Sequence, residues 1–340
     1  MSRRARSSLQ KSLAFWAVTK GQMEVAAAFA AAEVQSDRVY RVYCVPTLTP
    51  QSISGRLAPQ VAHALRHGSN IRLLILDMSV TGYVGLGAML DLIVILQLIR
   101  RHLPCRIQVH TPERRAAMDF LSNTGFIQAL EGMCEIRLPA SNRGAGGKPV
   151  QLKRIMGVAS IDGSSAVKFA VGEIRRRQIK NTLHRQLNYS GREIARLASI
   201  LGELCQNVPD HCQSRGVAAI VGQGEGTGSF VDIGIADPGV GVEATLRTKY
   251  ASAIGDRWNG VAALDLAFQP GTSRFDGRGD GLPEVLDAVR HLKGSLVARS
   301  GGAVYLCSPD KGSRCERDAA CDVLPGTQVY VRLPFRQGVQ

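Results

Sequence analysis

The sequence predicts an α/β protein built from two domains. Segments rich in β-forming residues alternate with helical segments through the first half, and further helices and strands follow in the second half. Strands that alternate with helices are typical of layered α/β folds. Residues 140–148 read Ala-Ser-Asn-Arg-Gly-Ala-Gly-Gly-Lys, the composition of a flexible connection. We therefore expect a basic, helical leader at 1–37, a first domain at 38–139, a linker at 140–164 and a second domain at 165–336.

The first domain is expected to follow an Ala-rich helical segment at residues 23–34. Residues 71–77 form a continuous apolar run that suits a buried strand. Around it we expect strands at 38–45 and 105–110, and helices at 58–67, 86–101 and 113–121.

The second domain is expected to begin with a basic helical region at residues 166–187. A longer helix starts near Ser190, because its apolar residues then recur at helical spacing. Strands at 217–221 and 230–236, a Gly-rich irregular stretch, a helix at 282–292 and strands near 295–299, 303–307 and 327–333 complete the order. This order favours one layer of helices over a mixed sheet.

Charge and hydropathy limit the classes of function. The 340 residues include 42 Lys or Arg and 28 Asp or Glu, a formal charge of +14 that favours an anionic partner without choosing one. The most apolar stretch, residues 84–99, is interrupted by Asp91 and Gln97 and is shorter than the roughly 20 residues of a membrane span. The eight cysteines form no C-x-x-C pair, which favours reduced thiols over a zinc site. We expect a cytoplasmic protein without a membrane span.

Three short segments of the second domain contain polar residues or glycines that could form a ligand site. Glu203 and Asn207 are four residues apart, so on a helix they share one face, where a carboxylate and a carboxamide can activate a water and hold magnesium. Asp237 follows a strand and precedes Gly239 and Gly241, which allow the backbone to approach a flat base.

The third segment is a run of alternating glycines that leads directly into a helix. Gly277, Gly279 and Gly281 precede an amphipathic segment, and the free N–H groups of a helix N-terminus attract phosphate. Taken singly, each of the three segments is equally consistent with an ordinary polar helix face, a tight turn or a flexible loop.

In this order the three segments resemble the N, G1 and G2 boxes of the gyrase, chaperone, histidine-kinase and mismatch-repair (GHKL) ATPases. Gly326-Thr327 before the last strand resembles the closing Gly-Thr of that family. The resemblance covers about half the chain and implies a Bergerat-type α/β sandwich that binds ATP and Mg²⁺.

The resemblance also implies a role for each matching residue. Glu203 would be the general base and Asn207 the magnesium ligand, while Asp237 would hold the adenine amino group. Gly239 and Gly241 would shape the adenine pocket, and Thr327 would add a contact near the adenine. Gly277, Gly279 and Gly281 would form the lid and its hinge over the phosphates. Ser273, Arg274 and Arg278 are further candidates for phosphate contact in the lid. Pro209, two residues after the magnesium ligand, should kink or end the helix and displace His211 from its axis.

The first domain resembles a STAS domain, the fold of anti-sigma-factor antagonists. The match runs from Leu74 to Leu90 and continues to residues 124–126. In regulated STAS domains a turn carries the serine or threonine that accepts phosphate, but here the turn reads Gly82-Tyr83-Val84-Gly85. Ser79 and Thr81 lie too early, so we expect a docking or scaffold module.

The two resemblances together predict a regulatory switch of the anti-sigma type. ATP would order the lid and change how the chain holds a protein partner, such as a sigma factor or a STAS-type regulator, and serine/threonine kinase activity is compatible with Glu203 and Asn207. An ATPase with ATP-gated homodimerisation and a histidine kinase using His184 remain alternatives. Nucleic acid is a further, less favoured partner, for which residues 143–196 supply twelve Lys or Arg against three acidic residues.

Overall fold

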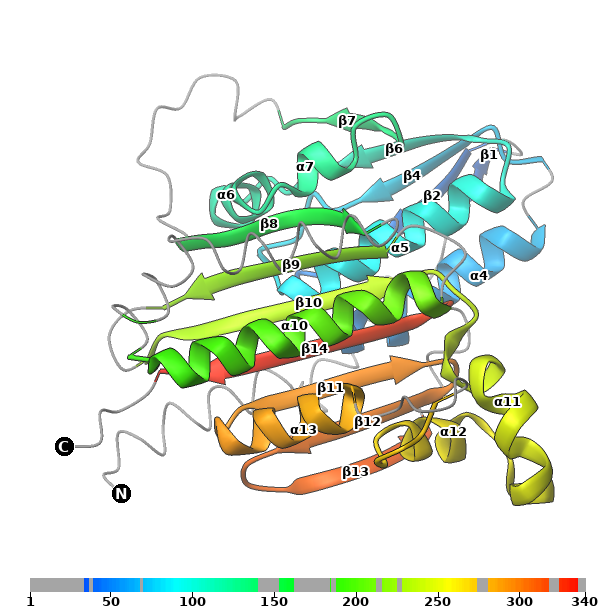
Figure 1. Ribbon diagram of the computed structural model, residues 1–340. Helices are drawn as coiled ribbons and strands as arrows, with labels where there is room; N and C mark the ends of the chain where they lie inside the picture. Colours follow the sequence, from blue (N-terminus) through cyan, green and yellow to red (C-terminus); the bar gives the residue numbers. More distant parts are fainter. Residues whose placement is uncertain are drawn as a thin grey trace.

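The computed structural model describes residues 34–36, 39–67, 70–139, 153–161, 184, 188–211, 216–224, 228–273, 281–317 and 324–335. These residues form two main sheets with helices between and beside them (Figure 1), so the predicted α/β class is confirmed. Of the leader expected at 1–37, residues 1–33 lie outside the described residues and Val34–Ser36 form a strand; the basic region expected at 166–187 lies outside them except for His184. Among the described helices, none is long and apolar enough to cross a membrane.

The first sheet has the strand order β1-β2-β4-β6-β7. Strands β2, β4, β6 and β7 run parallel, and β1 is antiparallel to β2. The strands span Val34–Ser36 (β1), Val39–Tyr43 (β2), Leu73–Asp77 (β4), Arg106–His110 (β6) and Glu135–Arg137 (β7). A separate parallel pair joins β3 (Thr47–Leu48) to β5 (Tyr83–Val84).

The helices of the first half lie close to where they were expected. A short α3 and a π-helical turn precede α4, and α5 occupies the long apolar segment. Their bounds are Pro50–Ser52 (α3), Ile53–Leu57 (η2), Ala58–His67 (α4), Leu86–His102 (α5), Arg115–Asn123 (α6) and Phe126–Ala129 (α7).

The second sheet has the strand order β13-β12-β11-β14-β10-β9-β8. Every described pairing in it is antiparallel, so the expectation of a mixed sheet is wrong for this half. The strands span Lys153–Ile161 (β8), Gly216–Gln223 (β9), Phe230–Asp237 (β10), Ser295–Ser300 (β11), Ala303–Ser308 (β12), Gly312–Arg317 (β13) and Thr327–Pro334 (β14). Strand β8 lies inside the range expected to be a linker, so the second sheet begins earlier than predicted.

The helices of the second half include two that the sequence did not suggest. Helices α11 (Gly241–Ile254) and α12 (Gly260–Ala267), with a 3-10 turn η6 (Gly255–Arg257) between them, occupy the stretch expected to be irregular. Helix α10 (Gly191–His211) ends two residues after Pro209 rather than at it, and α13 (Gly281–His291) matches the expected helix.

Helix α5 lies between the two sheets and covers the face of the second sheet opposite α10 and α13 (Figure 1). The residues of β9 alternate accordingly. Val217, Ala219 and Val221 belong to the core that contains α5, while Ala218 and Ile220 belong to the core beneath α10. A strand that is buried on both faces reads as a continuous apolar run. The second sheet is therefore covered by helices on both faces, and the two halves share one core.

Two glycines allow this close packing of α5. A Cβ atom at Gly234 of β10 would lie 2.6 Å from Cδ1 of Leu90, and one at Gly87 of α5 would lie 2.7 Å from Cγ of Pro50. Both distances are shorter than real Cβ contacts, so larger residues there would push α5 away from β10 and β14.

Candidate functional site

Three polar residues lie side by side where three strands of the second sheet meet the same edge. Asp237 at the end of β10 is in register with Thr327 at the start of β14, and Thr327 is in register with Ser300 at the end of β11. Directly paired residues in neighbouring strands point to the same face of a sheet. We name Asp237, Thr327 and Ser300 the strand-end row.

Backbone contacts fix the geometry of this row. The N–H of Gly239 donates to Oδ1 of Asp237 over 2.8 Å, which orients the carboxylate at the strand end. The Ser300 hydroxyl donates to the carbonyl oxygen of Gly326 over 3.0 Å and accepts from the N–H of Val242 over 2.7 Å. The same hydroxyl lies 3.4 Å from Oγ1 of Thr327. The row is thus tied both to the turn before β14 and to the first turn of α11.

Glycines at the row bring the backbone close to the polar groups. Gly241 and Gly326 both have a φ of +78°, a conformation that residues with a Cβ rarely adopt. A Cβ at Gly326 would lie 2.6 Å from Oδ1 of Asp237 and 2.6 Å from the nitrogen of Gly239. A Cβ at Gly241 would lie 2.7 Å from Oγ of Ser300. Only glycine fits at these two positions without movement of the row.

Helix α10 passes over the same edge of the sheet. A Cβ at Gly216, the first residue of β9, would touch Cγ1 of Val208 at 2.5 Å and the carbonyl oxygen of Ala236 at 3.1 Å. Val208 of α10 therefore lies next to the residue that precedes Asp237. Asn207, which precedes Val208, is half-buried. Asn207, the expected magnesium ligand, thus belongs to the part of α10 that passes over this edge.

Glu203, one turn earlier on α10, faces the beginning of α13. The Glu203 side chain is exposed, and its Oε2 would lie 3.0 Å from a Cβ at Gly281, the first residue of α13. The structure therefore brings Glu203 to one of the three glycines expected in the lid region. Gly277 and Gly279 lie outside the described residues, as do Arg274 and Arg278.

The remaining candidates have ordinary structural contacts. The backbone of Ser273 is held by the hydroxyl of Tyr250 on α11, which donates to the Ser273 carbonyl oxygen over 3.2 Å. His184 is exposed, and its Nδ1 lies 2.8 Å from the carbonyl oxygen of Tyr189. The side chain of His211 lies outside the described residues. Among the residues that are described, no group of three His, Cys, Asp or Glu could hold a metal ion.

The sequence reasoning missed Ser300. A single serine at the end of a strand has no motif around it, and the register of β11 against β14 places it in the row only in the folded chain. The position of Ser300 between Thr327 and the start of α11 could not have been inferred before helix α11 was known.

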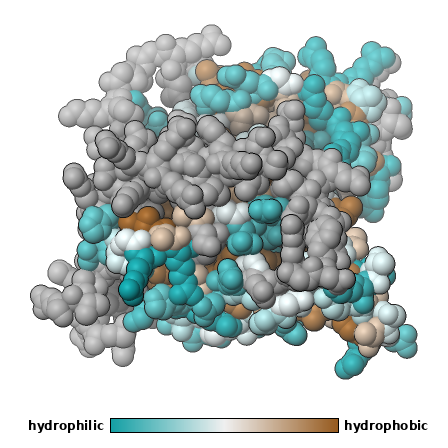
Figure 2. Space-filling model, viewed as in Figure 1, coloured by the Kyte–Doolittle hydropathy of each residue, from teal (hydrophilic) through white to brown (hydrophobic). Residues whose placement is uncertain are grey.

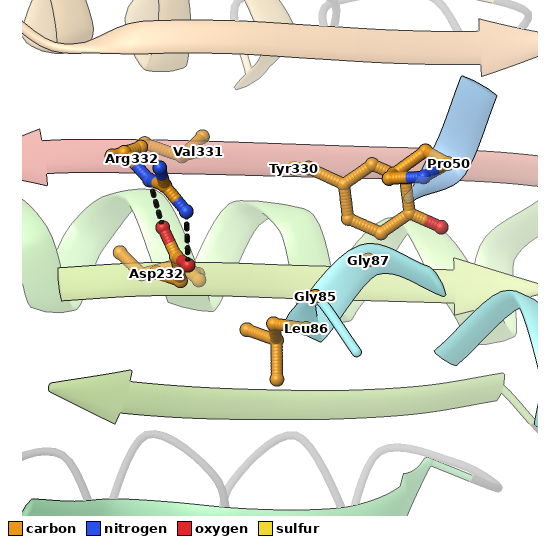
Figure 3. A pocket seen from close by; sticks show the side chains of 9 residues that line it. Pro50, Gly85, Leu86, Gly87, Asp232, Tyr330, Val331 and Arg332 are labelled. Carbon is orange, nitrogen blue, oxygen red and sulfur yellow. Dashed lines mark hydrogen bonds and ion pairs between the residues drawn. The ribbon is translucent and has the colours of Figure 1, made fainter. Parts of the chain in front are cut away.

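A small pocket lies on the opposite face of the second sheet, where the two halves meet (Figure 3). Asp232 and Arg332 face each other in it through two hydrogen bonds of 2.6 and 2.7 Å, and the Arg332 guanidinium lies 4.1 Å from the centre of the Phe230 ring. Pro50 lies beside the ring of Tyr330 on the other side of the pocket. The charged groups of this pocket are paired with each other, so we interpret it as part of the interface between the two halves, called the joint below, and not as a ligand site.

The turn expected to lack a phosphate acceptor is also described. Gly85 precedes the first turn of α5, and the aliphatic hydroxyls of Ser79 and Thr81 before the turn both have partners. Ser79 donates to Oδ1 of Asp77 over 2.6 Å, and the buried Thr81 donates to the carbonyl oxygen of Val45 over 3.1 Å. Burial opposes ionisation of Asp77, but hydrogen bonds from Ser79 and Arg41 lower its pKa below the ordinary value. The hydroxyls therefore serve the local fold around an ionised carboxylate.

Comparison with known proteins does not assign this chain to a family. No family model matches this chain, and no curated protein sequence matches it either. The resemblances to GHKL ATPases and STAS domains therefore stay predictions that rest on the motifs and on the geometry described above.

Proposed function

We propose that this chain is an ATP-binding regulatory protein in which nucleotide at the strand-end row changes how the chain holds a protein partner. The observation that carries the proposal is the register of Asp237 with Thr327 at the edge of the second sheet where Val208, the neighbour of Asn207 on α10, packs against Gly216. Asp237 is oriented by the N–H of Gly239 and is suited to accept a hydrogen bond from an exocyclic amino group.

The residues at this edge fit a nucleotide with magnesium. The two positive-φ glycines let the turns pack directly against the row, Gly326 against Asp237 and Gly241 against Ser300, which holds the Asp237 carboxylate in place for a base. Asn207 and Glu203 offer oxygen atoms, which are the ligands that Mg²⁺ prefers. Bound Mg²⁺ would neutralise charge on the phosphate oxygens.

Each side chain then has a separate task. Asp237 would select the base, Thr327 would add a hydroxyl beside it, and Asn207 would hold the metal ion. Glu203, exposed beside the first residue of α13, is placed to accept a proton from a water or from a hydroxyl of a partner protein. Gly281 allows α13 to approach Glu203 closely. A ligand bound at this edge would therefore change the conformation or the mobility of the first turn of α13.

The first half would supply the partner surface. Because α5 packs on β10 and β14, a change in the strands that carry Asp237 and Thr327 acts directly on the STAS-like half. A sigma factor or a STAS-type regulator is the partner class that the resemblance implies, in a cytoplasmic setting, and the chain would act as a switch whether or not it also transfers or hydrolyses phosphate.

Hydrogen exchange and product analysis test this proposal together. We expect Mg²⁺ and ATP to slow amide exchange in the first turn of α13, and we expect Glu203→Gln to keep that protection while losing any release or transfer of the γ-phosphate. Gln206→Ala, exposed on the same helix, serves as the matched control and should behave like the wild type. Unchanged exchange in α13 at saturating ATP would reject the switch.

A further inference from the structure

Five exposed arginines gather at the edge of the first sheet where its parallel strands begin. Arg100 and Arg101 end α5, Arg106 begins β6, and Arg72 immediately precedes β4. The N–H of Arg106 donates to the carbonyl oxygen of Arg72 over 2.9 Å, so these two residues are neighbours. Arg66 lies in the last turn of α4, which leads into the same edge. We name Arg66, Arg72, Arg100, Arg101 and Arg106 the arginine edge.

Figure 2 shows hydrophilic residues gathered at the upper right, where Figure 1 places the end of α5 and the beginnings of β4 and β6. His102, also exposed, follows Arg101. Basic residues in the last turn of a helix complement the helix dipole, which explains one or two positive charges at the end of α5. It does not explain the arginines that begin β6 and precede β4.

The arginine edge has no acidic counterpart within the described residues. No ion pair joins Arg66, Arg72, Arg100, Arg101 or Arg106 to a described carboxylate, although Arg100 donates to the carbonyl oxygens of Gly132 and Met133. Several arginines elsewhere in the described chain are paired with a carboxylate: Arg115 with Asp119, Arg137 with Glu135, Arg196 with Asp287, Arg247 with Glu243 and Arg314 with Glu316. Uncompensated like charges at one edge create a positive potential that a polyanion would relieve.

The composition of the edge indicates which polyanion fits. The guanidinium fork matches phosphate oxygens in a bidentate geometry, and the edge is made of arginine without lysine. The large hydrophobic side chains that are exposed in the described chain are Val80, Leu138 and Val240, none of which belongs to the edge. A protein interface normally centres on an aromatic or apolar anchor, and a membrane-surface helix inserts apolar side chains.

We propose that the arginine edge binds the phosphate backbone of nucleic acid without reading its sequence. Among the described residues 70–72 and 100–106 there is no Phe, Tyr or Trp to stack on a base, so we expect the contacts to be mainly to phosphates. Such binding is electrostatic and weakens steeply with salt. The inference does not rest on nucleotide binding at the strand-end row, because the two sites lie on different halves.

Fluorescence anisotropy with a labelled 30-base-pair duplex of arbitrary sequence, over a series of salt concentrations, tests this inference on the full chain. We expect the triple variant Arg72→Glu, Arg101→Glu, Arg106→Glu to bind about tenfold or more weakly at 0.1 M salt. We also expect the slope of log affinity against log salt to fall by about 3, roughly one for each lost phosphate contact.

The matched control changes three exposed arginines of the second half by the same total charge: Arg257→Glu, Arg290→Glu and Arg314→Glu. Circular dichroism shows whether both variants are folded. Equal weakening in the two triple variants would overturn the proposal, and so would a wild type that does not bind the duplex at low salt. Binding to vesicles containing phosphatidylserine, with none to the duplex, would also overturn it and assign the edge to a membrane surface.

Discussion

Replacement of Gly326 by alanine is expected to destabilise the fold by about 3 kcal/mol or more and to disrupt the strand-end row. The added Cβ would lie 2.6 Å from both Oδ1 of Asp237 and the nitrogen of Gly239, and the residue would have to keep a φ of +78°. Left-handed backbone alone costs about 1 kcal/mol for a residue with a Cβ, and a clash with backbone atoms adds to that cost. Urea unfolding followed by circular dichroism measures the loss.

Gly312 supplies the matched control for this variant. Its φ is +66°, but nothing lies within 4 Å of the position a Cβ would take. Gly312→Ala should therefore show only the backbone cost, about 1 kcal/mol. If the two alanine variants lose the same stability, the close approach of the turn before β14 to Asp237 is wrong.

Replacement of Asp91 by asparagine is expected to change how stability depends on pH. Asp91 is fully buried on α5, accepts a hydrogen bond from the hydroxyl of Tyr330 and has Nη1 of Arg299 3.7 Å from its Oδ2. Burial raises the pKa of Asp91 to about 7, against the opposing effects of Arg299 and Tyr330. This group connects α5 to β11 and β14, so its titration reports on the joint between the halves.

The sign follows from the raised pKa. A carboxyl that binds its proton more tightly in the folded state contributes stability that is complete below its unfolded pKa, near 4, and is lost as the pH rises through about 7. Relative to Asp91→Asn, the wild type should lose about 2 kcal/mol or more in the free energy of unfolding between pH 5 and pH 8.

Urea unfolding of both proteins at pH 5, 6, 7 and 8 measures this difference. Asp256→Asn, which alters an exposed carboxylate, controls for the loss of one negative charge. A constant difference between wild type and Asp91→Asn across this range would mean that Asp91 does not titrate inside the joint.

The positions of helices and strands could be predicted from the sequence better than the contacts between them. Residues 58–67 and 86–101 were expected as helices, and the structure has α4 and α5 there, because both segments have strong apolar patterning. The packing of α5 between the sheets was not foreseen. A helix that is buried on every side has the same apolar sequence whichever elements surround it, so the sequence of α5 did not indicate its neighbours. The continuous apolar sequence of β9 is explained by burial of both of its faces, which only the structure shows.

Helix α11 and strand β8 show why other parts could not be predicted. Residues 241–254 have little amphipathic periodicity, with only Gly241 and Leu246 buried, so no apolar stripe marked the segment as a helix. Strand β8 follows a Gly-rich stretch and gains its order by pairing with β9, a contact between distant parts of the chain. For the candidate site, the motifs predicted Asp237, Thr327, Glu203 and Asn207. That Asp237 and Thr327 lie side by side could not be predicted, because it depends on the register of β10 and β14.

Calorimetric titration of the full chain with ATP and Mg²⁺ tests the central claim most directly. Wild type should bind, Asp237→Asn should bind at least about 30-fold more weakly because the base would lose a charge-assisted hydrogen bond, and Asp265→Asn, exposed on α12, should bind like wild type. The absence of heat of binding in the wild type, or equal affinity in Asp237→Asn and wild type, would contradict a nucleotide site at the strand-end row.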